Sequence, residues 1–281
     1  MKNKNTLVRN VLTFLLLLIL LAIFIYPIYV ILINSFKVRR DIVAEPLSFI
    51  GSQGWSARNY TEAFRKMIFP RTFLNSLIIT VSSVCLIILT SSLAAYIFAR
   101  KQWKVNKFFY SLMLASMVIP FQVLMIPLVS VYGAQLNLLN RRITLILMHT
   151  GFSVSMAIFM FRSYIATSVP VSLEEAATID GANIYQTFFR IVLPLLKPIT
   201  ATVATLYSVS IWNDFLLPTL VLTRKGLWTL PIATQQFYGT YSSDLGLIMG
   251  ALVMVAIPVI VLYLLLQKQV LSGVVAGAVK G

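Results

Sequence analysis

The stretch SLEEAATIDGANIYQTFFRIVLP runs from Ser172 to Pro194. It holds three of the chain's eight acidic residues, Glu174, Glu175 and Asp180, within seven positions. Only 11% of the 281 residues are charged, and 59% are hydrophobic. A cluster of carboxylates in so apolar a chain marks this segment as chemically different from its surroundings.

The segment reads as two short helices joined by a turn. Ser172 followed by Glu175 predicts a capping box at the start of the first helix. Gly181 lies where that helix would end, because glycine adopts the left-handed conformation at little cost. Asn183, with Gln186 three positions on, predicts the start of a second helix. That second helix would carry apolar residues and stop before a proline: Phe188, Phe189, Ile191 and Pro194. From these residues alone, a connecting loop and a docking element are equally good interpretations.

The rest of the chain has the composition of a membrane protein. Mean hydropathy is +0.88, and the apolar residues form long uninterrupted blocks, which is typical of membrane spans. Backbone groups find no water in the bilayer core, so we expect an all-α polytopic fold. We predict six transmembrane helices, at approximately 11–35, 73–99, 108–132, 143–161, 199–222 and 245–266.

The excess of basic residues is better explained by membrane topology than by nucleic-acid binding. The net charge of +15 fits the Lys and Arg residues that flank membrane spans, so we expect the lipid bilayer and no nucleic acid as a partner. If both termini are cytoplasmic, 12 basic residues lie inside and 11 outside, a difference too small to orient the chain. The dense loop RKQWKVNK at 100–107 favours the N-terminus inside. The first apolar run is too long for a signal peptide, so we expect it to remain as a helix.

Catalytic and metal chemistry are not expected. The chain has one cysteine, Cys85, and one histidine, His149, which leaves little basis for a metal site. The spans contain no nucleophile–base pair, so a membrane-embedded enzyme is disfavoured. The phosphate-binding pattern G-x-x-x-x-G-K-[ST] does not occur, so we expect no catalytic residues and no cofactor bound by this chain itself.

A few polar residues within the spans are candidates for a transport pathway. Asp214 is the only Asp, Glu, Lys or Arg inside the six predicted spans. It lies with Asn213 in WNDFLLP and would either line a pathway or hold two helices together. Gln122 lies between Pro120 and Pro127, where a kinked, pore-facing helix and plain packing are both plausible. For His149 we favour a hydrogen-bonded packing role over proton relay.

The pattern E-A-A, three residues, G, nine residues, I-x-L-P resembles the signature loop of membrane subunits of bacterial ABC importers. It is matched by Glu175, Ala176, Ala177, Gly181, Ile191, Leu193 and Pro194. The stretches NYTEAF, NSLIITVSS, LAAYIFAR, MVIPFQVLMIPL, LNLLN, WNDFLLP and GVVAGAVKG extend the resemblance over most of the chain. They are similar to the carbohydrate-uptake branch, in particular to the second membrane subunit of maltose-type systems.

That resemblance implies a type I ABC importer permease fold over residues 1–281, as a single domain. It implies a coupling loop at about 162–198, in which Glu174, Glu175 and Asp180 face an ATPase subunit, and a cytoplasmic tail at 267–281. Gly277 and Lys280 of the tail would contact the ATPase, although an unstructured end explains its composition equally well. Both termini would be cytoplasmic, in a bacterial cell membrane.

The same resemblance implies partners. An extracytoplasmic solute-binding protein would deliver a sugar or oligosaccharide, and two ATPase subunits would bind ATP and Mg²⁺. This chain would form half of the pathway, in what the resemblance favours as a heterodimer with a second permease. The alternative is an ion-coupled secondary transporter acting alone. Such carriers usually show internal repeats or several intramembrane ionisable groups, which this sequence lacks.

Overall fold

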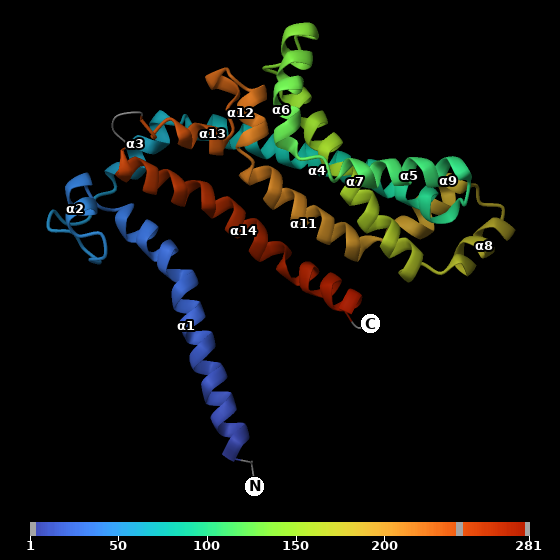
Figure 1. The fold of residues 1–281 in the computed structure, drawn as a ribbon, viewed down its shortest axis with the longest axis horizontal. Helices are drawn as coiled ribbons and strands as arrows, with labels where there is room; N and C mark the ends of the chain where they lie inside the picture. Colours follow the sequence, from blue (N-terminus) through green and yellow to red (C-terminus); the bar gives the residue numbers. More distant parts are fainter. Residues whose placement is uncertain (1–3, 240–243, 279–281) are drawn as a thin grey trace. The chain divides into compact units, whose positions relative to one another are not determined.

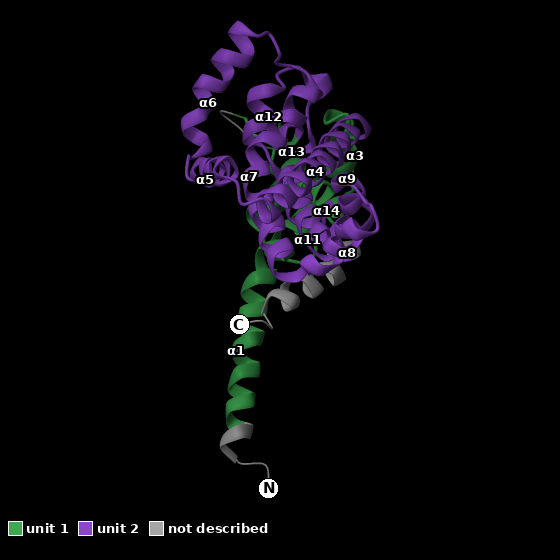
Figure 2. Cartoon of the chain, turned by 90° about the vertical axis from the view of Figure 1, so that its right-hand side faces the viewer, with its two compact units in different colours: residues 1–69, 234–258 green, residues 70–233, 259–281 purple. Residues whose placement is uncertain are grey.

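The computed structural model describes the backbone of residues 4–239 and 244–278 and the side chains of residues 8–239 and 244–264. These residues form helices and loops, with no β-strand among them (Figure 1). Two compact units divide the chain: residues 1–69 with 234–258, and residues 70–233 with 259–281 (Figure 2). We refer to them as unit 1 and unit 2.

The helices follow one another with short connections. Their bounds are α1 Lys4–Asn34, α2 Arg39–Ala44, α3 Arg58–Lys66, α4 Phe69–Arg100, α5 Lys104–Ser116, α6 Phe121–Val129, the π-helix η1 Ser130–Gln135, α7 Arg142–Ser168, α8 Val171–Ile179, α9 Ile184–Thr187, the π-helix η2 Phe188–Val192, α10 Leu193–Leu195, α11 Lys197–Asn213, α12 Leu216–Val221, the 3₁₀-helix η3 Lys225–Leu227, α13 Leu230–Gln235 and α14 Leu245–Ala278.

Length and composition identify the spans. Among the described residues, four helices are long and apolar enough to cross a membrane: Val8–Ser35, Phe69–Arg100, Arg142–Ser168 and Leu245–Leu264. Two bent helix pairs bring the number to six if each pair makes one span: Lys104–Ser116 with Phe121–Gln135, and Ile184–Leu195 with Lys197–Asn213. The all-α polytopic prediction is therefore confirmed.

The third predicted span is sharply broken. The helices on either side of the break, Lys104–Ser116 and Phe121–Gln135, meet at 94°. Pro120 occupies the N-cap of α6, with an extended ψ of 132°. Because proline donates no backbone hydrogen bond and restricts the residue before it, a helix cannot continue smoothly through this position. Of the two prolines that made a kink plausible, Pro120 lies at the break, whereas Pro127 lies inside α6.

The fifth predicted span is also discontinuous, which the sequence did not predict. Its first part, α11, ends at Asn213, and its second part, α12, begins at Leu216. Between them Asp214 is extended, with ψ 128°. Its Oδ1 accepts a hydrogen bond of 3.0 Å from the Leu216 amide. The carboxylate thus satisfies an amide that the helix break leaves without an intrahelical partner.

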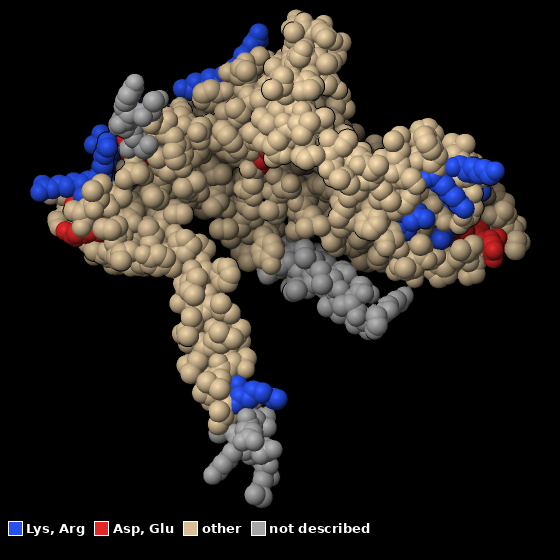
Figure 3. All heavy atoms as spheres, viewed as in Figure 1, with Lys and Arg blue, Asp and Glu red and all other residues tan. Residues whose placement is uncertain are grey.

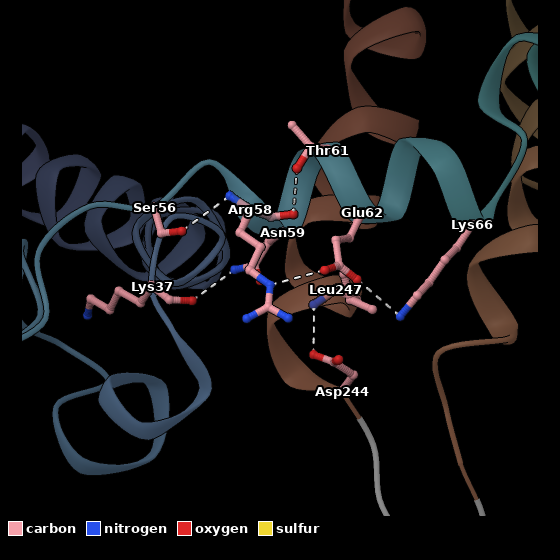
Figure 4. A network of polar contacts seen from close by, with 9 residues as sticks. All are labelled: Lys37, Ser56, Arg58, Asn59, Thr61, Glu62, Lys66, Asp244 and Leu247. Atoms are coloured by element: carbon pink, nitrogen blue, oxygen red, sulfur yellow. Dashed lines mark hydrogen bonds and ion pairs between the residues drawn. The ribbon is translucent and has the colours of Figure 1, made fainter.

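In unit 1, the loop after α1 holds two short helices, α2 and α3. Asn59 of α3 donates through Nδ2 to the carbonyl of Ser35 at 2.9 Å and to that of Lys37 at 2.8 Å (Figure 4). Glu62 contacts Arg58 at 3.0 Å and Lys66 at 3.4 Å on the exposed face of the same helix. The hydrogen bond from Arg58, followed by that from Lys66, lowers the pKa of Glu62 below its usual value.

Unit 2 is built around α7. Its central residues Ala157, Ile158 and Phe161 are completely or almost completely buried, within a core that continues through α4, the segment around η2, and α11. Ser83 and Ser91 on α4 are buried and have small side chains. Small residues on a helix surface allow neighbouring helices to approach closely in the membrane. The core therefore fixes α4 against the segment that carries the acidic cluster.

The last helix includes most of the predicted tail. The helix α14 continues to Ala278, so residues 267–278 extend the final span rather than forming a separate segment. Gly277 lies in its last turn, where the structure describes only the backbone. Lys280 lies outside the described residues.

Candidate functional site

The turn after α8 has the geometry predicted for Gly181. Its φ is +84°. The Gly181 amide donates to the carbonyl of Thr178 at 3.1 Å, and the Ala182 amide donates to that of Ala177 at 2.9 Å. This pair of bonds is the Schellman motif, which requires a left-handed residue after the helix. A Cβ built on Gly181 would meet no atom within 4 Å, so any side chain here would project outward.

The two predicted helix starts have different outcomes. Asn183 and Gln186 form a reciprocal capping box, with both bonds at 2.9 Å, so this prediction is confirmed. The capping box predicted from Ser172 and Glu175 is wrong. The helix begins two residues earlier than predicted, at Val171, because Pro170 takes the N-cap position with extended ψ and no side-chain cap. Ser172 is therefore already inside the first turn.

Glu174 points into the protein. Arg100 Nε at the end of α4 donates to Glu174 Oε1 at 2.8 Å, and the Tyr96 hydroxyl donates to Oε2 at 2.9 Å. The guanidinium of Arg100 also donates to the Val169 carbonyl at 2.7 Å. The expectation that all three carboxylates face a partner is therefore wrong for Glu174. The reason is helix periodicity: Glu174 and the buried Ala177 lie three residues apart, on the face of α8 that packs against the rest of unit 2.

The opposite face of the segment is solvent-exposed. Glu175, Ala176 and Asp180 are exposed. Two large side chains of the segment are also mostly exposed to solvent, Ile179 at 86% and Tyr185 at 71%. Figure 3 shows acidic and basic side chains gathered at the end of unit 2 that carries α8 and α9. We call Glu175, Ala176, Ile179, Asp180 and Tyr185 the exposed loop face. Further along, Ile191 and Leu193 are half-buried and Pro194 is exposed.

A cavity of about 760 Å³ lies elsewhere in unit 2. It is bounded by α5, α6, α7 and the break between α11 and α12, and Asp214 and His149 both line it. Gln122 and Asn213 are exposed and do not line it. The structure therefore brings one of the three candidate pathway residues, Asp214, to the lining of this cavity.

His149 does not have the hydrogen-bonded environment expected for it. Its Nε2 is buried and has no hydrogen-bond partner among the described residues. Its Nδ1 lies 3.8 Å from Asp214 Oδ2, which is longer than a hydrogen bond. The sequence placed these two residues in different spans and gave no sign that they meet.

Arg100 and Tyr96 are the site residues that sequence reasoning missed. The sequence does draw attention to Arg100, because it begins the basic stretch RKQWKVNK. That stretch was interpreted only as a topology determinant. A buried carboxylate 74 residues further on cannot be recognised as its partner from spacing. Tyr96 lies within an apolar span and gives no separate signal.

Comparison with known proteins gives concordant matches. The family model described as "Binding-protein-dependent transport system inner membrane component" matches residues 87–270. The chain is 37% identical to the probable starch degradation products transport system permease protein of Thermoanaerobacterium thermosulfurigenes, covering 94% of each chain. It is 35% identical to the melibiose/raffinose/stachyose import permease protein of Bacillus subtilis (strain 168), over the whole of both chains.

A solved structure shares the fold. A chain of a bacterial ABC transporter involved in the import of the acidic polysaccharide alginate aligns with a TM-score of 0.79 and 23% identity, covering 95% of this chain and 98% of that one. The family match and the two relatives cover the acidic segment, the cavity residues and most of the spans together. The chain therefore belongs to the family of inner membrane components of binding-protein-dependent transport systems.

Proposed function

We propose that this chain is one permease subunit of an ATP-driven importer and forms half of the translocation pathway for a sugar or oligosaccharide. Relatives at 35–37% identity are named as permeases for starch degradation products and for melibiose, raffinose and stachyose. This supports a saccharide as the transported class. A self-contained, ion-coupled carrier is not favoured, because the family transports with a separate binding protein.

The observation that carries the coupling role is the exposed loop face. Ile179 and Tyr185 expose apolar surface beside the carboxylates of Glu175 and Asp180. Exposed aromatic and aliphatic side chains rimmed by charge are typical of protein interaction sites. The Schellman turn at Gly181 and the capping box at Asn183 hold this face in a fixed shape. We propose that it docks on an ATPase subunit and transmits the movement driven by ATP.

The complete assembly follows from that role. We propose that this chain pairs with a second, different permease subunit, that two ATPase subunits bind ATP and Mg²⁺, and that an extracytoplasmic solute-binding protein delivers the sugar. The acidic segment and both termini would then lie in the cytoplasm. The tail residues Gly277 and Lys280 are proposed to approach the same ATPase subunits.

Purification of the tagged full-length chain from its native membrane in mild detergent tests this proposal. We expect a second permease and ATPase chains to co-purify, and ATP hydrolysis by the complex to rise when the solute-binding protein is added with raffinose or maltotriose. Proteoliposomes of the complex should take up sugar only with ATP inside. Ion-driven uptake by the chain alone, without co-purifying ATPase, would refute the proposal.

A further inference from the structure

The break between α11 and α12 lies at the wall of the 760 Å³ cavity. Non-helical backbone at membrane depth is tolerated where protein buries it or where it lines a water-filled cavity, and broken helices in transporters often surround substrate sites. The Asp214 side chain is 26% exposed, and its Oδ1 is held by the Leu216 amide. Its second oxygen, Oδ2, faces His149.

The two polar groups are spaced for a shared ligand. His149 Nδ1 and Asp214 Oδ2 are 3.8 Å apart, too far for a direct hydrogen bond. A single hydroxyl between them can lie within normal hydrogen-bonding distance of both. A hydroxyl suits this position because it donates and accepts at once: it would donate to the carboxylate and accept from the imidazole N–H.

The remainder of the cavity suits a polyhydroxylated ring. The side chains of Ser155 and Ser210 contribute hydroxyl groups to its lining. Phe121 and Phe152, which pack edge to face at 5.2 Å, contribute apolar surface to the same lining. The volume falls in the range of small-molecule sites, which combine apolar walls with a few placed polar groups.

We infer that this cavity is a saccharide-binding subsite on this subunit, in which one sugar hydroxyl bridges Asp214 and His149. The inference rests on the proposed function and extends it, because it has this permease contact the sugar directly. A cation is a poorer occupant. The lining contains a single carboxylate, and no cluster of three metal-ligating side chains occurs among the described residues, whereas hard cations require several oxygen ligands.

Thiol protection in the assembled complex tests the subsite. Cysteine is introduced at Ser155 or Ser210 in a Cys85→Ser background, and alkylation by N-ethylmaleimide is timed with and without raffinose or maltotriose. We expect either sugar that the complex transports to slow both reactions several-fold. Ser163→Cys is the control, since this exposed residue lies on the same helix as His149 but outside the cavity lining, and its alkylation rate should not change.

A second measurement assigns the role of the carboxylate. Asp214→Asn keeps an oxygen for the Leu216 amide, so the helix break can fold, but loses the charge facing His149. We expect sugar transported per ATP hydrolysed to fall about tenfold, the size expected for one hydrogen bond to a charged group, while ATPase and permease chains still co-purify. Rapid, sugar-independent alkylation at both cavity positions in a complex that transports the sugar would overturn the subsite and leave the proposed function standing. A complex that neither contains ATPase chains nor transports sugar would overturn both.

Discussion

Arg100 Nε lies 2.8 Å from Glu174 Oε1, so an ion pair joins the end of α4 to the first turn of α8. Both side chains are largely buried, at 14% and 11% exposure, and the Tyr96 hydroxyl completes the site. The acidic segment thus presents Glu175 outward and is anchored inward by its neighbour. The pair therefore connects α8 directly to the end of α4.

Breaking the ion pair should destabilise the protein. We expect Glu174→Ala to cost roughly 3–5 kcal/mol, because it leaves the Arg100 guanidinium buried without its counter-charge. The measurement is the thermal unfolding temperature of the purified complex. Glu175→Ala is the matched control: it removes an exposed carboxylate that has no ion pair among the described residues, and it should leave that temperature nearly unchanged while weakening ATPase retention. Equal unfolding temperatures for the two variants would contradict the anchoring role.

Gly181→Val should separate docking from folding. A β-branched residue at φ +84° is strained by roughly 1–2 kcal/mol, and its side chain would project from the turn beside the exposed loop face. We expect the variant to remain in the membrane with its partner permease, to lose ATPase chains on purification and to lose uptake. The readout is the subunit stoichiometry of the purified complex.

Gly54 provides a control for backbone strain. It also has positive φ, +76°, and open space around its Cβ position, but it lies in the loop after α1. Gly54→Val should therefore show comparable strain with normal ATPase retention. If it loses ATPase chains to the same extent as Gly181→Val, the effect of the latter is general destabilisation rather than a blocked contact.

Lys104 and Glu175 should lie on the same side of the membrane. Two spans separate them, and both are exposed. With the exposed native thiol removed by Cys85→Ser, cysteines at 104 and 175 should stay unlabelled by a membrane-impermeant thiol reagent in intact cells. A cysteine at Arg58, whose side chain is 76% exposed and which lies one span away from the Lys104 side, should be labelled. The reverse pattern would place the acidic segment outside the cytoplasm.

Gly246→Ala should destabilise unit 1. A Cβ at Gly246 would lie 2.5 Å from Asn59 Oδ1, and Asn59 cannot move freely because its amide bonds the carbonyls of Ser35 and Lys37. We expect the variant to lose about 1–3 kcal/mol of stability, as is typical of overpacking. Its thermal unfolding temperature should fall accordingly. Gly151→Ala, at a helical glycine with no atom within 4 Å of its Cβ position, should leave the temperature unchanged or raise it. Equal unfolding temperatures for the two variants would mean that the Asn59 side chain can move away from the added methyl group.

Much of this protein is determined by local sequence chemistry. The long apolar blocks specify the spans because the bilayer admits only backbone that bonds to itself. Pro120 specifies the kink between α5 and α6, and Gly181 and Asn183 specify the turn and the second helix, because each acts through its own φ, ψ or side-chain cap. The spacing of the signature residues was sufficient to indicate the family. These features depend on neighbours a few residues away, so they can be recognised without the fold.

The direction in which each carboxylate points was decided by tertiary structure. Glu174 and Glu175 are adjacent and chemically alike, yet one is buried against Arg100 and the other faces solvent. The difference arises because an α-helix turns by about 100° per residue, and only the packing of α8 in unit 2 determines which face is inward. Asp214 and His149 likewise meet across two spans at a helix break that no local pattern predicted. Long-range contacts of this kind depend on how helices pack, which a single sequence does not record.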